Sequence, residues 1–113
     1  MKYLLLGLVT EAGQRLQGRE LESWMAEIGA WYEKNAASGT LADPGHQLDR
    51  PHTAKTVRAS GVTDGPYMES KEVLGGYSLL EAGTIDDAVE LAKTWPGVDA
   101  GWITMEVRPV VLQ

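Results

Sequence analysis

Residues 62–77 read VTDGPYMESKEVLGGY and combine the densest turn signal with the densest polar cluster of the chain. In the tripeptide at 64–66, Asp can bond to nearby backbone, Gly accepts unusual dihedral angles, and Pro disfavours helix at the preceding residue. Charged side chains crowd positions 69–72, and the glycine pair at 75–76 predicts a bulge or a close backbone approach at the start of a strand. Two interpretations stay open, an exposed connection between strands or the rim of a pocket.

The composition indicates one globular domain that spans residues 1–113. With 43% hydrophobic residues the chain can build a core, and it is not disordered by composition. Ten basic against sixteen acidic residues give a net charge of −6, and Lys and Arg form no cluster. Direct binding of nucleic acid is therefore not expected. The absence of cysteine excludes disulfides, thiolate metal sites and cysteine catalysis.

The apolar run at residues 2–9 is too short to span a bilayer and is not followed by a small-residue cleavage site. It predicts a buried strand, no membrane association and a cytoplasmic protein. A polar loop is expected at 11–18.

The spacing of apolar residues predicts two amphipathic helices. The first, at 19–37, carries an apolar stripe and stops at Gly39; the stripe consists of Leu21, Trp24, Met25, Ile28, Trp31 and Tyr32. The second opens at Thr84 with a pattern like a capping box and ends at the Pro-Gly pair 96–97. Its apolar face consists of Ile85, Ala88, Val89, Ala92 and Trp95.

The other segments predict strands. The segment 40–42 begins one that Asp43-Pro44-Gly45 would break or bend, and the further strands are expected at 54–59, 62–63, 77–82 and 103–107. The order β-α-β-β-β-α-β predicts an α+β fold, a ferredoxin-like antiparallel sheet with two helices on one face. The other face is either polar or covered by another subunit. Tyr3, Tyr77 and Trp102 are expected to contribute to it, which indicates a dimer.

Several segments of this sequence resemble those of a known protein family. The segments TDGPYMESKE at 63–72 and LGGY at 74–77 resemble the signature of the DGPF branch of the YCII-related proteins, with Tyr67 in place of the usual Phe. Similarity extends to most of the chain through MKYLL at 1–5, AKTVR at 54–58, DDAVELA at 86–92 and EVRPV at 106–110. The resemblance implies a homodimer that packs sheet against sheet, the dimeric α/β barrel.

The resemblance implies less about function. Most such proteins have no assigned activity, some relatives look like lactone isomerases or dehydrochlorinases that use a His-Asp pair, and the DGPF branch is often associated with extracytoplasmic-function sigma factors. The enzyme-like pattern places a His at the start of the first helix. Residues 19–22 contain none, so that catalytic inference does not carry over.

A local substitute pair is available. His46 can transfer a proton near neutral pH, and Asp64 can orient it. The alternatives are an exposed loop histidine and an aspartate that only stabilises its turn. Arg108 can hold a substrate carboxylate in a bidentate pair, or it can pair internally with Glu106 or Glu72.

Tyr67, Glu69 and Lys71 are the other substrate-binding candidates, with a solvated charged face as the alternative. His52 has no evident partner. The spacing of His46, Asp49 and His52 matches no zinc pattern, so no metal or cofactor is predicted.

Two functional hypotheses result. In the first, the protein is a small-molecule-binding homodimer, in its catalytic version a lyase or isomerase that uses His/Asp acid–base chemistry on a small carboxylated ring compound. In the second, it is a non-catalytic regulatory or accessory module that meets a protein partner in extracytoplasmic-function sigma factor signalling.

Overall fold

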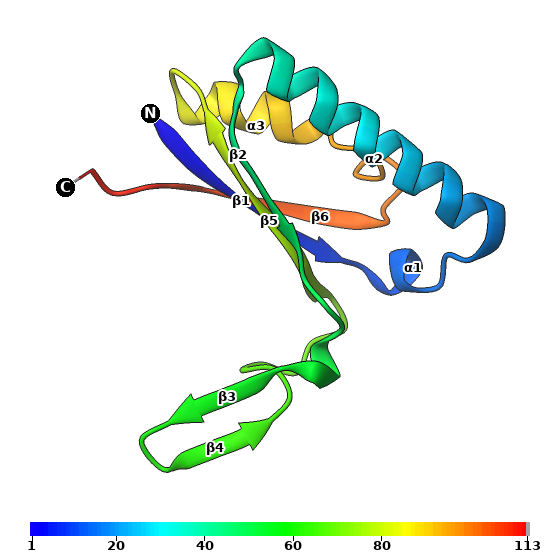
Figure 1. The fold of residues 1–113 in the computed structure, drawn as a ribbon, viewed down its shortest axis with the longest axis vertical. Helices are drawn as coiled ribbons and strands as arrows, with labels where there is room; N and C mark the ends of the chain where they lie inside the picture. Colours follow the sequence, from blue (N-terminus) through cyan, green and yellow to red (C-terminus); the bar gives the residue numbers. More distant parts are fainter. Residues whose placement is uncertain (113) are drawn as a thin grey trace.

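A four-stranded antiparallel sheet forms the body of the protein in the computed structural model, which describes residues 1–112 (Figure 1). Its order is β2-β5-β1-β6, built from β1 (Lys2–Val9), β2 (Leu41–Gln47), β5 (Val73–Glu81) and β6 (Ile103–Pro109). The helices α2 (Gly18–Ser38) and α3 (Ile85–Lys93) cover one face of this sheet. The predicted ferredoxin-like α+β fold is confirmed.

A separate hairpin projects from the end of the sheet (Figure 1). It pairs β3 (Lys55–Arg58) with β4 (Gly61–Asp64) and follows the short 3₁₀-helix η1 (Pro51–Thr53). The two strands predicted around the turn at residues 60–61 are therefore confirmed. Because the hairpin does not pack against the helices, its side chains are largely exposed.

The helix ends show the capping chemistry expected from the sequence, with one addition. Thr84 Oγ1 accepts from the Asp87 N–H at 3.1 Å and opens α3, and Gly39 closes α2 with φ of 80°. The prediction of a loop at 11–18 is wrong for its first half, because residues Glu11–Gln14 form the helix α1. Thr10 Oγ1 accepts from the Gly13 N–H at 3.1 Å and forms an N-cap that the sequence pattern did not predict. No helix within residues 1–112 combines the length and apolarity needed to cross a bilayer.

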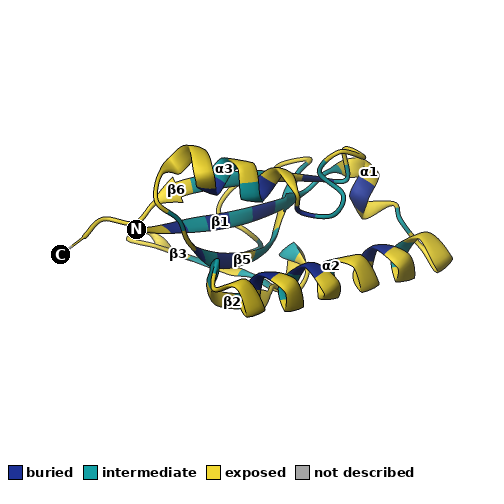
Figure 2. Cartoon of the chain, turned by 90° about the horizontal axis from the view of Figure 1, so that it is seen from above, coloured by how far each residue is buried: buried dark blue, intermediate teal, exposed yellow. Residues whose placement is uncertain are grey.

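The core lies between the sheet and the helices, where Figure 2 shows the buried residues of α2 and α3 facing the strands. Tyr3 is only 2% exposed, so its predicted place on the face without helices is wrong. Side chains alternate along a strand, and Tyr3 shares the helix-facing side with Leu5. Trp102 also belongs inside, because it packs edge-on against Trp24 with ring centroids 5.6 Å apart.

Two irregularities shape the sheet, one in the edge strand β2 and one in its neighbour β5. Of the two outcomes predicted for Asp43-Pro44-Gly45, the break is wrong and the bend is confirmed, because β2 continues through these residues as a bulged strand with shifts in register. The bulge predicted at the glycine pair is confirmed inside β5: Gly76 pairs with Gly7 and Leu74 with Leu8, which leaves Gly75 as the extra residue.

Gly45 is the residue that the β2 bulge requires. Its φ is +64°, and a Cβ at this position would lie 1.9 Å from the Tyr77 carbonyl oxygen. We expect Gly45→Ala to lower the free energy of unfolding by more than about 1 kcal/mol, because both the backbone and the contact are strained.

The matched control is Gly29→Ala, at a helical site where a Cβ would meet nothing within 4 Å. It should raise stability by about 0.5–1 kcal/mol through helix propensity. Urea unfolding measures the change in the free energy of unfolding for both variants. Equal changes at the two sites would show that the β2 bulge does not require glycine at position 45.

Candidate functional site

A cavity of about 900 Å³ lies between the N-terminal half of α2 and the sheet. The apolar stripe predicted on this helix is buried at Trp24 and Trp31, whereas Leu21 and Ile28 are half-buried and Met25 is 40% exposed. All of these except Trp31 line the cavity. Some residues of the stripe are therefore buried in the core, and most of the stripe also forms the wall of the cavity.

Glycines on the strands leave room opposite the helix. Gly7 of β1 and the pair Gly75 and Gly76 of β5 line the cavity without contributing a side chain. A Cβ at Gly7 would approach Ile103 Cδ1 to 3.1 Å, and one at Gly76 would approach the His46 carbonyl oxygen to 3.1 Å. The hollow thus follows from residue choice on two neighbouring strands.

A pair of hydroxyls joins helix and sheet at this cavity. Tyr32 of α2 and Ser78 of β5 hydrogen-bond with their oxygens 2.6 Å apart, and Ser78 Oγ also donates to the Pro44 carbonyl at 3.0 Å. Ser78 is 1% exposed. The hydroxyl of Ser78 therefore connects β5 to α2 on one side and to the β2 bulge on the other.

Trp95 carries a polar atom that is closed off from the cavity. The residue lines the cavity and is 8% exposed, and its buried Nε1 has no hydrogen-bond partner within residues 1–112. Other core indoles are paired, since Trp24 Nε1 donates to the Pro96 carbonyl at 2.7 Å and Trp31 Nε1 to Thr94 Oγ1 at 2.9 Å. A buried donor left unpaired costs about 1–3 kcal/mol, so this indole carries an unused hydrogen bond.

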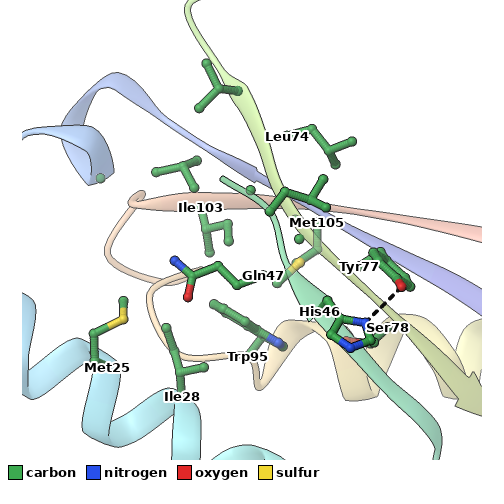
Figure 3. A pocket seen from close by; sticks show the side chains of 18 of the residues that line it. Met25, Ile28, His46, Gln47, Leu74, Tyr77, Ser78, Trp95, Ile103 and Met105 are labelled. Atoms are coloured by element: carbon green, nitrogen blue, oxygen red, sulfur yellow. Dashed lines mark hydrogen bonds between the residues drawn. The ribbon is translucent and has the colours of Figure 1, made fainter. Parts of the chain in front are cut away.

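His46 hydrogen-bonds to Tyr77, with Nδ1 and the phenolic oxygen 3.1 Å apart. Ser78 reaches α2, so its neighbour Tyr77 points to the opposite face of the sheet, and His46, directly across from Tyr77, shares that face. Gln47 points back toward α2, where Figure 3 shows it near Met25 and Ile28. Both residues of the pair line the cavity, but their hydrogen-bonded groups lie on the face without helices.

The predicted partners His46 and Asp64 line different cavities. Asp64 lies on the hairpin, pairs with Lys55 and borders a second cavity of about 420 Å³ together with Glu69. His52 lines both cavities. Its spacing in the sequence gave no sign of this, because the 3₁₀-turn at residues 51–53 places it there. Catalysis by the His46–Asp64 pair stays a prediction.

The remaining predicted residues each make contacts of their own within the chain. Arg108 forms an ion pair with Glu106 on β6 and is three strand spacings from β2, roughly 14 Å. Tyr67 is 73% exposed beneath the Arg58 guanidinium, 5.6 Å from its ring centroid. Lys71 contributes its carbonyl, which accepts from Gln14 Nε2 at 2.7 Å. Their proposed contacts with substrate stay predictions.

Metal ligands do not gather in the described part of the chain. Residues 1–112 hold no group of three or more His, Asp or Glu side chains placed to share an ion.

Comparisons with known proteins agree with this architecture. Residues 1–111 match the family described as the YCII-related domain. An uncharacterized protein of Rhizobium meliloti is 32% identical over 97 residues, which cover 82% of this chain and 77% of the relative. The fold is also similar to 5-chloro-2-hydroxyhydroquinone dehydrochlorinase from Burkholderia phenoliruptrix in complex with 2,5-dihydroxybenzoquinone. That likeness has a TM-score of 0.54 and 17% identity and covers 100% of this chain and 96% of the other.

Removal of the Ser78 hydroxyl tests the link between sheet and helix. Ser78→Ala should lower the free energy of unfolding by about 1–3 kcal/mol, because the part-buried Tyr32 hydroxyl and the Pro44 carbonyl both lose their partner. Ser60→Ala, at an exposed turn with no such contact, should stay within about 0.5 kcal/mol of the parent. Urea unfolding measures both, and an equally small effect at Ser78 would show that the link contributes nothing.

Proposed function

Because the chain belongs to the YCII-related family, we propose that it is a small-molecule-binding protein whose ligand occupies the cavity between α2 and the sheet. The cavity carries this proposal. Its volume of about 900 Å³ lies in the range of small-molecule sites, and its walls are apolar side chains with a few convergent polar groups. The Tyr32 and Ser78 hydroxyls, from two residues that line the cavity, are such groups.

The ligand class that suits these walls is a small ring compound that bears oxygen. Leu21, Ile28 and Met105 offer apolar contact to a ring, while the hydroxyl groups match oxygen substituents. The 2,5-dihydroxybenzoquinone bound to the dehydrochlorinase of similar fold has this chemistry, which supports its use as a first probe.

Filling the cavity tests the proposal. Ile28→Trp adds a large ring to the cavity wall, and we expect it to weaken binding of 2,5-dihydroxybenzoquinone at least tenfold, about 1.4 kcal/mol, by titration calorimetry. Ala26→Trp places the same side chain on an exposed site of the same helix and should bind like the parent. No binding to the parent would favour the partner-binding alternative, and equal binding by Ile28→Trp would locate the ligand elsewhere.

In the catalytic version of this proposal, His46 transfers a proton and Asp64 orients the His46 ring. Arg108 holds a carboxylate of the substrate. In one protomer the His46 hydrogen bond faces away from α2, Asp64 lies on the hairpin and Arg108 on the far edge strand. The geometry supports ligand binding more directly than lyase or isomerase chemistry.

The position of the His46 ring predicts how a substitution of this histidine changes ligand affinity. Because the His46 ring lies on the face without helices, His46→Gln should change the Kd for 2,5-dihydroxybenzoquinone less than twofold. A loss comparable to that of Ile28→Trp would place the ring inside the binding cavity and revive the acid–base version.

The homodimer belongs to the same proposal. The face without helices carries apolar side chains along β1 and β5, among them Leu6, the exposed Leu74 and the exposed Tyr77. Sheet-to-sheet packing would bury them. We expect a sedimentation mass of about twice 12.3 kDa, and a monomer for Leu6→Lys. Val57→Lys, on the exposed hairpin, should remain dimeric, and a monomeric parent at tens of micromolar would contradict the dimer.

A further inference from the structure

We propose that the Gln47 side-chain amide selects the ligand of this cavity by pairing with a ring compound that carries a hydrogen-bond donor beside a carbonyl oxygen. The inference rests on the proposed function, because it assigns the recognition chemistry of the same cavity. Gln47 is the last residue of β2, lines the cavity and is exposed, so a bound molecule can reach its amide. The side-chain hydrogen bonds of this part of the chain involve Asp43, His46 and Asp49, and none within residues 1–112 uses the Gln47 amide.

The register of the sheet places the Gln47 side chain on the cavity side. Gln47 pairs with Gly76 of β5 and directly follows His46, whose hydrogen bond lies on the face without helices. Because neighbouring side chains on a strand point to opposite faces, Gln47 points toward α2. Figure 3 shows its amide end reaching toward Met25 and Ile28. Since Gly76 has no side chain, β5 leaves the Gln47 side chain room to extend into the cavity.

The other amide and hydroxyl side chains that line the cavity already have partners. Gln14 Nε2 donates to two backbone carbonyls, at 3.1 and 2.7 Å. The Tyr32 and Ser78 hydroxyls hydrogen-bond to each other, and the Tyr77 hydroxyl has its partner on the other face of the sheet. Among these groups of residues 1–112, the Gln47 amide is therefore the one whose donor and acceptor are both available to a ligand.

The amide restricts the ligand because binding removes water from it. Its NH₂ group donates, its carbonyl oxygen accepts, and the two lie side by side in one plane. A ring that packs against Met25, Ile28 and Met105 displaces the water around the amide, and a polar group covered without a partner costs free energy. The favoured ligand presents the reverse pattern, a donor beside a carbonyl oxygen, as in a cyclic amide. A ring with two adjacent acceptors sets one of them against the Gln47 carbonyl oxygen and binds more weakly.

A pair of isosteric probes isolates this recognition. The cyclic amide 2-quinolone carries an N–H beside its carbonyl, where coumarin carries a ring oxygen, and the two molecules otherwise have the same shape. The parent should bind 2-quinolone at least tenfold more tightly than coumarin, because coumarin leaves the Gln47 carbonyl oxygen without a donor. Titration calorimetry gives both affinities.

Gln47→Met removes the amide, keeps an unbranched side chain of similar length and should reduce that ratio to about one or below. Gln17→Met is the matched control, because it makes the same change at an exposed residue that neither lines the cavity nor caps its helix with its side chain. It should keep the tenfold ratio. The difference in solvation between the two probes is common to all variants, so the ratios compare the site alone.

The outcomes separate the two claims. If Gln47→Met keeps the parent ratio, or if the parent binds both probes equally, Gln47 does not select the ligand, while the cavity proposal is still decided by Ile28→Trp. Binding of 2,5-dihydroxybenzoquinone without binding of 2-quinolone would likewise overturn this inference alone. If neither probe nor 2,5-dihydroxybenzoquinone binds the parent, the proposed function and this inference both fail.

A measurement on the unaltered protein covers the case in which Gln47→Met does not fold. The side-chain amide protons of Gln47 should show nuclear Overhauser contacts to bound 2-quinolone, because the proposed pairing holds the two groups together. Contacts between the ligand and the Met25 methyl group without any to the Gln47 amide would overturn the inference.

Discussion

The Ser78 hydroxyl connects the three elements on which the cavity depends. It hydrogen-bonds to Tyr32 of α2 and donates to the Pro44 carbonyl in the β2 bulge, and it is almost fully buried. A buried hydroxyl must keep such partners, which ties the C-terminal half of the helix to the edge of the sheet. Toward its N-terminus the same helix stands over glycines, and the space between them is the cavity.

The sheet architecture could be predicted because local signals agreed with the tertiary structure. The apolar run of β1, the alternation along β6 and the threonine cap of α3 each indicated their element correctly. The failures arose where tertiary contacts outweighed local preference. Pro44 tolerates the edge position because β2 pairs on one side only, and Gly45 absorbs the bulge with a positive φ.

The candidate site was less predictable, since helical periodicity does not distinguish a core stripe from a cavity wall. Leu21, Met25 and Ile28 have the spacing of core residues, and only the glycines on the opposing strands leave them facing a hollow. Trp95 likewise fitted the apolar face of the second helix. Its unpaired N–H depends on the absence of a carbonyl within reach, which no spacing encodes. The predicted pair of His46 and Asp64 instead draws on a residue paired with Tyr77 on the other sheet face and on a residue of the hairpin.

The position of a bound ring tests the account most directly. A crystal structure with 2,5-dihydroxybenzoquinone should show the ring in the first cavity, between Ile28 of α2 and Ser78 of β5. A ring bound against Tyr77 on the face without helices, or beside His52 and Asp64 in the second cavity, would contradict the account.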